Sequence, residues 1–240
     1  MEYTDIHTHI IPGVDDGAVS MEQSVLMLER AYNEGVRNII ATPHFGVRNT
    51  GYRPEIYEEN LNALMSYASE HCPNMKLFRG NELYYGPGIF SGLEDGMANT
   101  LAGSRYALVE FPFVTDFEEM FHGVRKFLTS GYIPIIAHVE RYRDYIGKLV
   151  NLEDLVSQGA LVQMNCSTIV NEWKRGFMGK KSWPIKALKA GLVHFIASDC
   201  HDMGERAPQM LKAAECLEEI VGREKAEEIL VGNPGMVIER

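Results

Sequence analysis

Hydrophobic residues recur along the chain in a unit of helix, glycine and strand. Ahead of each glycine the apolar residues have helical spacing, as Met21, Val25, Leu28 and Tyr32 do before Gly35. After it comes a short continuous apolar run, which is typical of a strand buried on both faces of a parallel sheet. A residue just past a helix end often needs positive φ, which glycine adopts readily. The glycines of this unit are Gly35, Gly131, Gly159 and Gly191.

Further segments extend the alternation over most of the chain. The pattern predicts more strands at 3–7, 75–81 and 106–111, and helices near 54–70, 117–130, 148–158, 184–190, 206–221 and 223–231. Alternation of this kind favours an α/β fold with a parallel sheet, and a closed barrel of about seven strands is favoured over an open sheet. No G-x-G-x-x-G or Walker sequence follows the first strand, which weakens a nucleotide-binding interpretation. Loops over one end of the barrel are expected at 45–54, 84–104 and the locally basic 166–183.

Composition and charge narrow the class of protein. The 240 residues, of which 45% are hydrophobic and 23% charged, suit a single soluble domain over 1–240. A formal net charge of −10 argues against nucleic acid as a partner. No signal peptide is apparent, and no apolar run reaches the roughly 20 residues of a membrane span. Because Cys72, Cys166, Cys200 and Cys216 are scattered, we expect reduced thiols and a cytoplasmic location without membrane insertion.

Imidazoles and carboxylates stand where the predicted strands end. In parallel α/β barrels the carboxyl ends of the strands assemble the active site at one rim. Side chains alternate faces along a strand, so residues two apart point the same way and one strand end can supply two ligands. Imidazole with carboxylate suits Zn, Mn or Fe. The strand-end residues are His7, His9, His44, Glu82, Glu110, His138, Asn165, Asp199 and His201.

Other candidates have simpler interpretations. His71, His122 and His194 lie away from the rim, and each is expected to be a hydrogen-bonded structural histidine. Asp15-Asp16-Gly17 is either a turn or, through Asp16, part of the rim. Cys200 and Arg206 have the spacing of cysteine-dependent tyrosine phosphatases, but that chemistry needs a thiolate in a loop of backbone donors. The acidic residues between them would raise the thiol pKa and repel phosphate.

Four segments of the chain resemble the PHP (polymerase and histidinol phosphatase) family. They are Asp5-Ile6-His7-Thr8-His9, Ala41-Thr42-Pro43-His44, Ala137-His138-Val139-Glu140-Arg141 and Ser198-Asp199-Cys200-His201. The resemblance runs in order over most of the chain. Within this family the sequence is most similar to bacterial tyrosine-protein phosphatases of capsule and exopolysaccharide loci, the CpsB/YwqE type. The stretches that carry this are 9–18, Gly80-Asn81-Glu82 and Val109-Glu110-Phe111-Pro112-Phe113.

The resemblance implies a distorted TIM-like (β/α)7 barrel with three metal ions (Mn, Fe or Zn) at the carboxyl ends of the strands. It implies a first metal on His7, His9, Glu82 and Asp199, a second on Glu82, Glu110 and His138, and a third on Asp16, His44 and His201. Asp16 and Glu110 stand where histidinol phosphatases tend to have histidine, which favours the tyrosine phosphatase branch. The implied substrate is a phosphotyrosine protein, a bacterial tyrosine autokinase that controls capsule or exopolysaccharide synthesis.

The expected chemistry is hydrolysis of a phosphomonoester by metal-activated hydroxide. Three divalent cations among four carboxylates leave a net charge of about +2, which matches a phosphate dianion. Arg141 and Arg206 are expected to clamp the phosphate, and either His44 or a water supplies the proton that the leaving group needs. Phe45, Phe113 and Tyr142 either pack the substrate ring or belong to the core.

Three other functions remain open at this point. The first is a small-metabolite phosphatase, such as a histidinol phosphatase, using the same site. The second is a non-catalytic PHP module that stabilises a partner, against which the intact ligand set argues. The third is an amidohydrolase, which usually relies on a carboxylated lysine, and no lysine stands at the rim.

Overall fold

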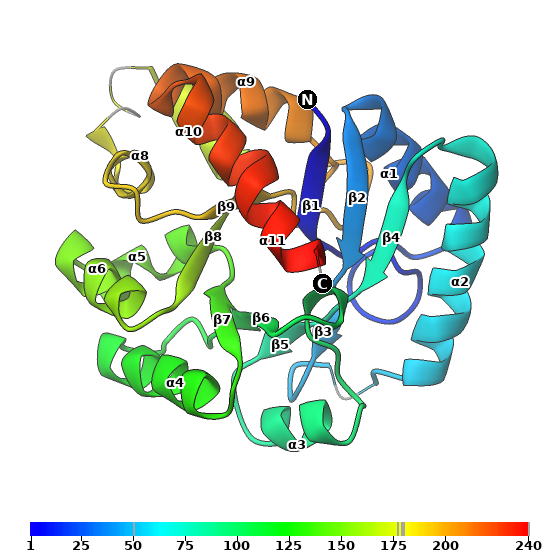
Figure 1. The fold of residues 1–240 in the computed structure, drawn as a ribbon, viewed down its shortest axis with the longest axis horizontal. Coiled ribbons are helices and arrows are strands. Elements are labelled where there is room, and N and C mark those ends of the chain that lie inside the picture. Colours follow the sequence, from blue (N-terminus) through cyan, green and yellow to red (C-terminus); the bar gives the residue numbers. More distant parts are fainter. Residues whose placement is uncertain (50, 177, 179–180, 240) are drawn as a thin grey trace.

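A computed structural model describes residues 1–49, 51–176, 178 and 181–239. Parallel strands alternate with helices, as the hydrophobic pattern predicts (Figure 1). The strands are β1 (Tyr3–Thr8), β2 (Val36–Ala41), β3 (His44–Phe45), β4 (Lys76–Arg79), β5 (Glu82–Tyr84), β6 (Tyr106–Glu110), β7 (Ile133–Ile136), β8 (Leu161–Asn165) and β9 (Phe195–Ala197). All named pairings between them are parallel.

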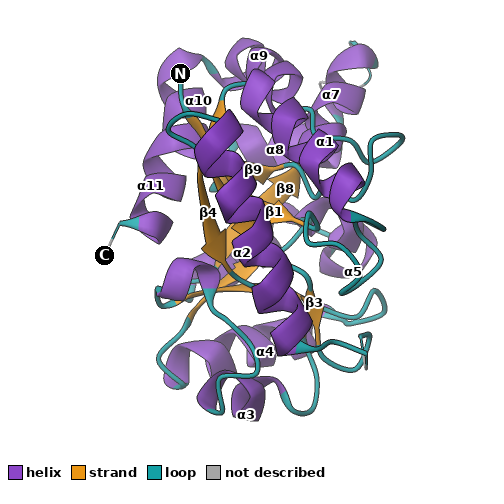
Figure 2. Cartoon of the chain, turned by 90° about the vertical axis from the view of Figure 1, so that its right-hand side faces the viewer, coloured by secondary structure: helices purple, strands orange, loops and turns teal. Residues whose placement is uncertain are grey.

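Helices pack around this sheet. They are α1 (Met21–Asn33), α2 (Pro54–His71), α3 (Ile89–Glu94), α4 (Phe117–Thr129), α5 (Arg143–Ile146), α6 (Leu149–Ser157), α7 (Cys166–Lys174), α8 (Trp183–Lys189), α9 (Met210–Val221), α10 (Arg223–Glu227) and α11 (Asn233–Ile238). Short helical turns lie between these elements: η1 (Leu101–Gly103), η2 (Val139–Tyr142) and η4 (Glu228–Gly232). Figure 2 shows α2 lying over β4. No described helix has the length and apolar character that a membrane span requires.

The glycines that punctuate the sequence have the expected conformation. Gly35, Gly131, Gly159 and Gly191 have φ values of 93°, 88°, 110° and 75°. A side chain is unfavourable at such φ, so these positions let each helix stop and turn into the next strand. At the start of α1, Ser20 accepts a hydrogen bond from the backbone N–H of Gln23 at 3.3 Å, as a capping residue does.

The sheet curls into a distorted barrel rather than a regular one. The expected second and third strands are each broken, into β2 with β3 and into β4 with β5, so that β1, β2 and β4 form one ladder and β3 and β5 to β9 another. The two ladders meet where β1 and β9 adjoin, because the N–H of Asp199 donates to the carbonyl of His7 and the N–H of His9 to that of Cys200, both at 2.9 Å. An α/β barrel-like fold is therefore confirmed.

An apolar core fills the inside of the barrel below the rim. Ile6, Ile40, Leu108, Ile135 and Phe195 face inward from five strands. Val237 of α11 and Leu101 of η1 belong to the same cluster, so these two elements cover the amino-terminal end, as Figure 1 shows for α11. The outward-facing residues of the same strands pack on the surrounding helices in a second, larger cluster.

Some sequence-based boundaries were wrong. The expected loop 84–104 contains α3 and η1, and the first half of 166–183 is the helix α7. Helix α9 begins at Met210 rather than at 206, and α5 and α11 were missed. The missed helices α5 and α11 have four and six residues, and the stability of such short helices depends on tertiary packing rather than on a repeated apolar pattern. Within the basic stretch, Lys180 lies outside the described residues.

Candidate metal centre

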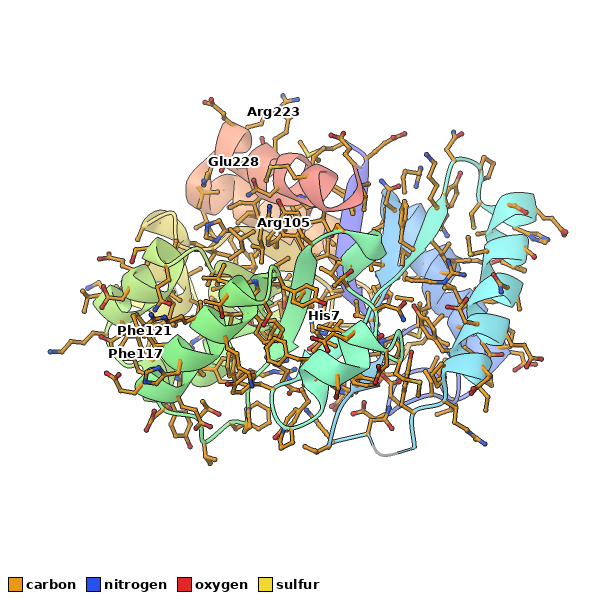
Figure 3. All side chains as sticks on the ribbon, turned by 60° about the horizontal axis from the view of Figure 1, so that its bottom comes forward. His7, Arg105, Phe117, Phe121, Arg223 and Glu228 are labelled. Atoms are coloured by element: carbon orange, nitrogen blue, oxygen red, sulfur yellow. The ribbon has the colours of Figure 1, made fainter. Side chains whose placement is uncertain are left out.

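The register of the strands places candidate ligands side by side. His44 of β3 pairs with Glu82 of β5, and Tyr84 of β5 pairs with Glu110 of β6. Parallel strands all end at the same edge, so polar residues at their carboxyl ends meet at a single rim. Figure 3 shows His7 in the interior of the molecule, whereas Phe117 and Phe121 of α4 lie at its periphery.

Glu82 lies at the centre of the cluster. Its Oε2 atom lies 3.4 Å from His7 Nε2 and 3.3 Å from His9 Nε2, and its Oε1 atom lies 2.8 Å from His138 Nε2. Asp199 Oδ1 lies 3.4 Å from His7 Nε2 and 3.5 Å from His9 Nε2. Ligand atoms spaced in this way fit around a cation at about 2.1 Å from each. One nitrogen each of His7 and His9 and one oxygen of Glu82 thus lie close enough together to share a cation, and Asp199 Oδ1 lies beside both imidazoles.

A second group of ligands lies beside the first and reaches solvent. Asp16 Oδ1 lies 3.2 Å from His44 Nε2 and 3.5 Å from His201 Nε2, and the ring centroids of His9 and His201 are 3.8 Å apart. The side chain of Asp16 is 55% exposed whereas those of the two imidazoles are buried, so the cluster opens to solvent at Asp16. A cavity of about 420 Å³ next to it is lined by Asp15, Asp16, His44, Arg48 and Asn49.

Several buried atoms of the candidate ligands have no hydrogen-bond partner among the described residues. An unpaired buried polar atom costs roughly 1–3 kcal/mol. His44 Nδ1 lies 2.8 Å from Glu82 Oε2, but the two are not aligned for a hydrogen bond. Metal ions would satisfy such atoms, so the donor set fits imidazole–carboxylate metal sites. The atoms are His44 Nδ1, Glu82 Oε2, Glu110 Oε2, His138 Nδ1 and His201 Nε2.

Charge in the cluster favours cation binding. Burial lowers the pKa of His138 to about 4, so that its ring is neutral, as a ligand imidazole must be. Burial and the neighbouring Glu82 raise the pKa of Glu110, which shows the cost of crowding carboxylates. Burial works against protonation of His44, but Glu82 and Asp16 outweigh it and raise its pKa to about 10. A cation on His44 must therefore displace a proton.

Both predicted phosphate-binding arginines lie at the rim. Arg141 Nη2 donates to Asp199 Oδ2 at 2.8 Å, and Arg206 Nη2 donates to Asp199 Oδ1 at 2.9 Å. The backbone of Asp199 has a φ of 51° and that of His138 a φ of 34°. Such conformations cost free energy in non-glycine residues and concentrate at functional sites. The strain here accompanies the presentation of two candidate ligands.

The remaining candidates are aromatic residues beside the rim and histidines away from it. The ring centroid of Tyr142 lies 5.8 Å from that of His138 and 6.3 Å from that of Phe113. The hydroxyl of Tyr142 is bonded to the backbone of Phe111, and Phe45 packs on Tyr52, so both belong to the core. Phe113 is 45% exposed. Val162 N–H donates to His194 Nδ1, while His71 stacks on Tyr67, which fits the structural interpretation of these histidines.

Cys200 does not have the environment of a nucleophile. Its side chain is buried, and burial raises the pKa of its thiol far above the usual range. A thiol-based phosphatase instead needs a thiolate at neutral pH.

Three residues at the site were missed at the sequence level. Asp15, considered only as part of a turn, accepts a hydrogen bond from His9 Nδ1 at 2.6 Å. Arg48 Nη1 donates to Glu110 Oε1 at 2.6 Å, and Gln163 Oε1 lies 3.1 Å from His7 Nδ1. Gln163 could have been recognised from the sequence, because it is a polar residue in an apolar strand and lies two residues before Asn165. Nothing in the local pattern distinguishes Arg48.

Fold and site together define a barrel-type α/β protein with clusters of candidate metal ligands at the carboxyl ends of its strands. The family described as capsular polysaccharide synthesis, CpsB/CapC, matches residues 3–239. The chain belongs to this family.

Named relatives cover nearly the whole chain. Tyrosine-protein phosphatase CpsB of Streptococcus pneumoniae is 35% identical over 98% of this chain and 97% of its own length. Tyrosine-protein phosphatase YwqE of Bacillus subtilis is 33% identical over 92% of this chain and 85% of its own length. The predicted resemblance to the CpsB/YwqE type is confirmed.

Solved structures agree with this assignment. A crystal structure from the pair YwqE of Bacillus subtilis and CpsB of Streptococcus pneumoniae matches with a TM-score of 0.85 and 30% identity, over 98% of this chain and 94% of that chain. Those two proteins are described as unique metal-dependent tyrosine phosphatases. The lactonase Lmo2620 of Listeria monocytogenes matches with a TM-score of 0.61 and 11% identity, which shows a shared fold alone.

Proposed function

We propose that this protein is a metal-dependent protein-tyrosine phosphatase. The observation that carries the proposal is the convergence of buried imidazoles on the carboxylate of Glu82, in a chain whose named relatives are tyrosine-protein phosphatases. The cluster has the donor types of a catalytic metal site, and it opens to solvent at Asp16.

The centre is proposed to hold three metal ions, with Mn, Fe and Zn as the candidates. The spacing around Glu82 supports a first metal on His7, His9, Glu82 and Asp199. His138 Nε2 lies 2.8 Å from Glu82 Oε1 and 3.7 Å from Glu110 Oε1, which supports a second on Glu82, Glu110 and His138. The proximity of Asp16 to two imidazoles supports a third on Asp16, His44 and His201.

Divalent cations held by these residues would supply positive charge for the phosphate dianion and a water of lowered pKa as the nucleophile. Arg141 and Arg206 stand at the same rim, where their guanidinium groups can hold phosphate oxygens in place of their contacts with Asp199. A phenol leaving group, with a pKa near 10, needs less protonation than an alkoxide does. The chain's part in the reaction is to bind and orient the phosphate. His44 must lose the proton of its ring to hold a metal, so a water is the remaining candidate for the proton donor.

The proposed substrate is a phosphotyrosine on a bacterial tyrosine autokinase that controls capsule or exopolysaccharide synthesis. Support comes from the capsular polysaccharide family to which the chain belongs. The exposed Phe113 is a candidate for packing the phenyl ring. We further propose that residues 1–240 act as a single domain in the cytoplasm, in line with the free, buried cysteines.

The test compares hydrolysis of a phosphotyrosine peptide and of histidinol phosphate, each with and without chelator. We expect turnover of the peptide to be far faster and to be lost with chelator. His7→Ala and Glu82→Ala should lose both metal and activity, whereas His122→Ala, on the outer helix α4, should keep both. Turnover that resists chelation, or full activity of the first two variants, would refute the proposal.

A further inference from the structure

Two buried amides lie inside the barrel on strand β8. Side chains alternate along a strand, so Gln163 and Asn165 share the inward face while Val162 and Met164 pack outward among the helices. Gln163 is fully buried and Asn165 is 5% exposed. Amides in such a place cost free energy unless their hydrogen bonds are satisfied, so their partners reveal what they do.

The carbonyl oxygen of Gln163 faces two donors, one from the backbone and one from a side chain. It accepts from the backbone N–H of His138 at 2.8 Å, and His7 Nδ1 lies 3.1 Å from it. A backbone N–H can only face an acceptor, so the amide orientation of Gln163 follows from chemistry. The proton of His7 must then lie on Nδ1, which leaves the Nε2 lone pair directed at Glu82 and Asp199.

The orientation of Gln163 fixes that of Asn165. Gln163 Nε2 donates to Asn165 Oδ1 at 2.8 Å, so the amide nitrogen of Asn165 must point the other way. That nitrogen donates to Asp199 Oδ2 at 2.8 Å. Arg141 donates to the same Oδ2 and Arg206 to Oδ1, but of these three donors only Asn165 is buried. Asn165 holds Oδ2 so that Oδ1 faces His7 and His9. Each hydrogen bond in the series has only one possible direction.

We propose that Gln163 and Asn165 form one positioning unit, which sets the tautomer of His7 and aims Oδ1 of Asp199 at the same metal ion. The proposal rests on the proposed function, because it assumes that His7 and Asp199 share a metal. Both amides would act through His7 and Asp199, so both are positioning residues. The unit connects strands β1 and β9 through β8, and its two ends are two ligands of one site.

Partners that orient metal ligands typically contribute about 10-fold to 100-fold in metal affinity. We therefore expect Gln163→Met, which keeps the side-chain length and removes both polar atoms, to lose metal at a chelator concentration about 10-fold to 100-fold lower than the unaltered protein does. Metal content is measured by elemental analysis after dialysis, and the cobalt-loaded protein is followed by its visible absorption. Asn38→Leu is the matched control, since Asn38 bonds Thr4 on a barrel strand without contacting a ligand.

A double-mutant cycle tests whether the two amides act together. Once Gln163→Met has released Asn165, adding Asn165→Leu should weaken metal retention by less than about twofold more, so that the two effects are not additive. The unit would be overturned if the effects of the two substitutions on metal retention multiplied. It would also be overturned if Gln163→Met had the metal retention and cobalt spectrum of the wild-type protein. If Gln163→Met does not fold, Asn165→Ser decides the Asp199 half by the same measurements.

The outcome separates this inference from the proposed function. The proposed function itself would be refuted if the wild-type protein bound no metal, or if it showed no chelator-sensitive turnover of the phosphotyrosine peptide. The positioning unit alone would be refuted if the wild-type protein showed bound metal and chelator-sensitive turnover, and the Gln163→Met variant retained metal equally well. Thermal unfolding of the chelator-treated proteins shows whether the substitution acts on the fold instead.

Discussion

The carboxylate of Asp15 accepts a hydrogen bond from Nδ1 of His9 at 2.6 Å, which leaves Nε2 of that ring for the metal cluster. Asp15 is also held in place, because its Oδ2 accepts from the backbone N–H of His44 at 3.0 Å and its Oδ1 from that of Gly17 at 2.9 Å. A carboxylate behind a ligand imidazole fixes the tautomer and raises its basicity. The carboxylate of Asp15 thus connects the candidate ligand His9 with the backbone of the candidate ligand His44.

Asp15→Asn should lower metal affinity by about 10-fold to 100-fold, because the amide can present a donor to a ring nitrogen that also donates. Activity at limiting metal should fall in parallel and recover in part at high metal concentration. Asp116→Asn, at the exposed start of α4, is the control, where the side chain caps a helix and asparagine does so equally well. Equal metal affinity in the two variants would refute this role for Asp15.

Arg206→Ala should lower kcat/KM for a phosphotyrosine peptide by about 10-fold to 100-fold while metal content stays unchanged, since a lost charge-assisted contact with phosphate costs about 1.5–3 kcal/mol. Inorganic phosphate should also become a weaker inhibitor. Arg105→Ala is the comparison, because Arg105 is exposed and lies just before β6, at the opposite end of that strand from Glu110. Loss of metal from Arg206→Ala would instead assign this arginine to holding Asp199.

Cys200→Ser should retain metal-dependent turnover within a few-fold of the unaltered protein. The thiol is buried and its raised pKa keeps it protonated, so it contributes no thiolate. The measurement is the rate before and after chelator, with metal content determined on the same samples. A Cys200→Ser protein that keeps its metal and has no turnover would revive the cysteine mechanism.

Metal binding should weaken as the pH falls. Burial opposes the charged form of His9, but Asp15 and Glu82 raise its pKa to about 9, and the pKa of His44 is raised to about 10. Both rings are therefore protonated near pH 7 before the metal binds, and a ligand imidazole must be neutral. Affinity should rise with pH up to these values, and calorimetry in buffers of different ionisation enthalpy should record proton release. An affinity that is constant between about pH 6 and 8 would contradict these pKa shifts.

Gly17→Ala should disturb the metal site more than the fold. A Cβ atom at Gly17 would overlap the backbone oxygen of His9 and approach its Cβ to 2.5 Å, so His9 or the turn must move. We expect metal affinity to drop by about 10-fold, while the chelator-treated protein unfolds at a similar temperature. Gly232→Ala, where nothing lies within 4 Å, should change neither property. Unchanged metal affinity in Gly17→Ala would show that the turn can yield.

The sequence by itself determined the alternating order of the main strands and helices, and which residues end the strands at the rim. Those features follow from local rules: apolar periodicity marks the elements, and glycine with positive φ separates helix from strand, as at Gly35 and Gly131. Because parallel strands end at one edge, the pattern also predicts that His7, Glu82 and Asp199 meet, and they do.

Only the tertiary structure decided what stands behind these side chains. Gln163 is 156 residues from His7 in sequence, and Arg48 is 62 from Glu110, so no local pattern connects either pair. The break of two strands and the cover formed by α11 likewise depend on packing between distant segments. Hydrogen bonds that orient ligands are formed across the barrel, and their geometry exists only once the sheet has curled.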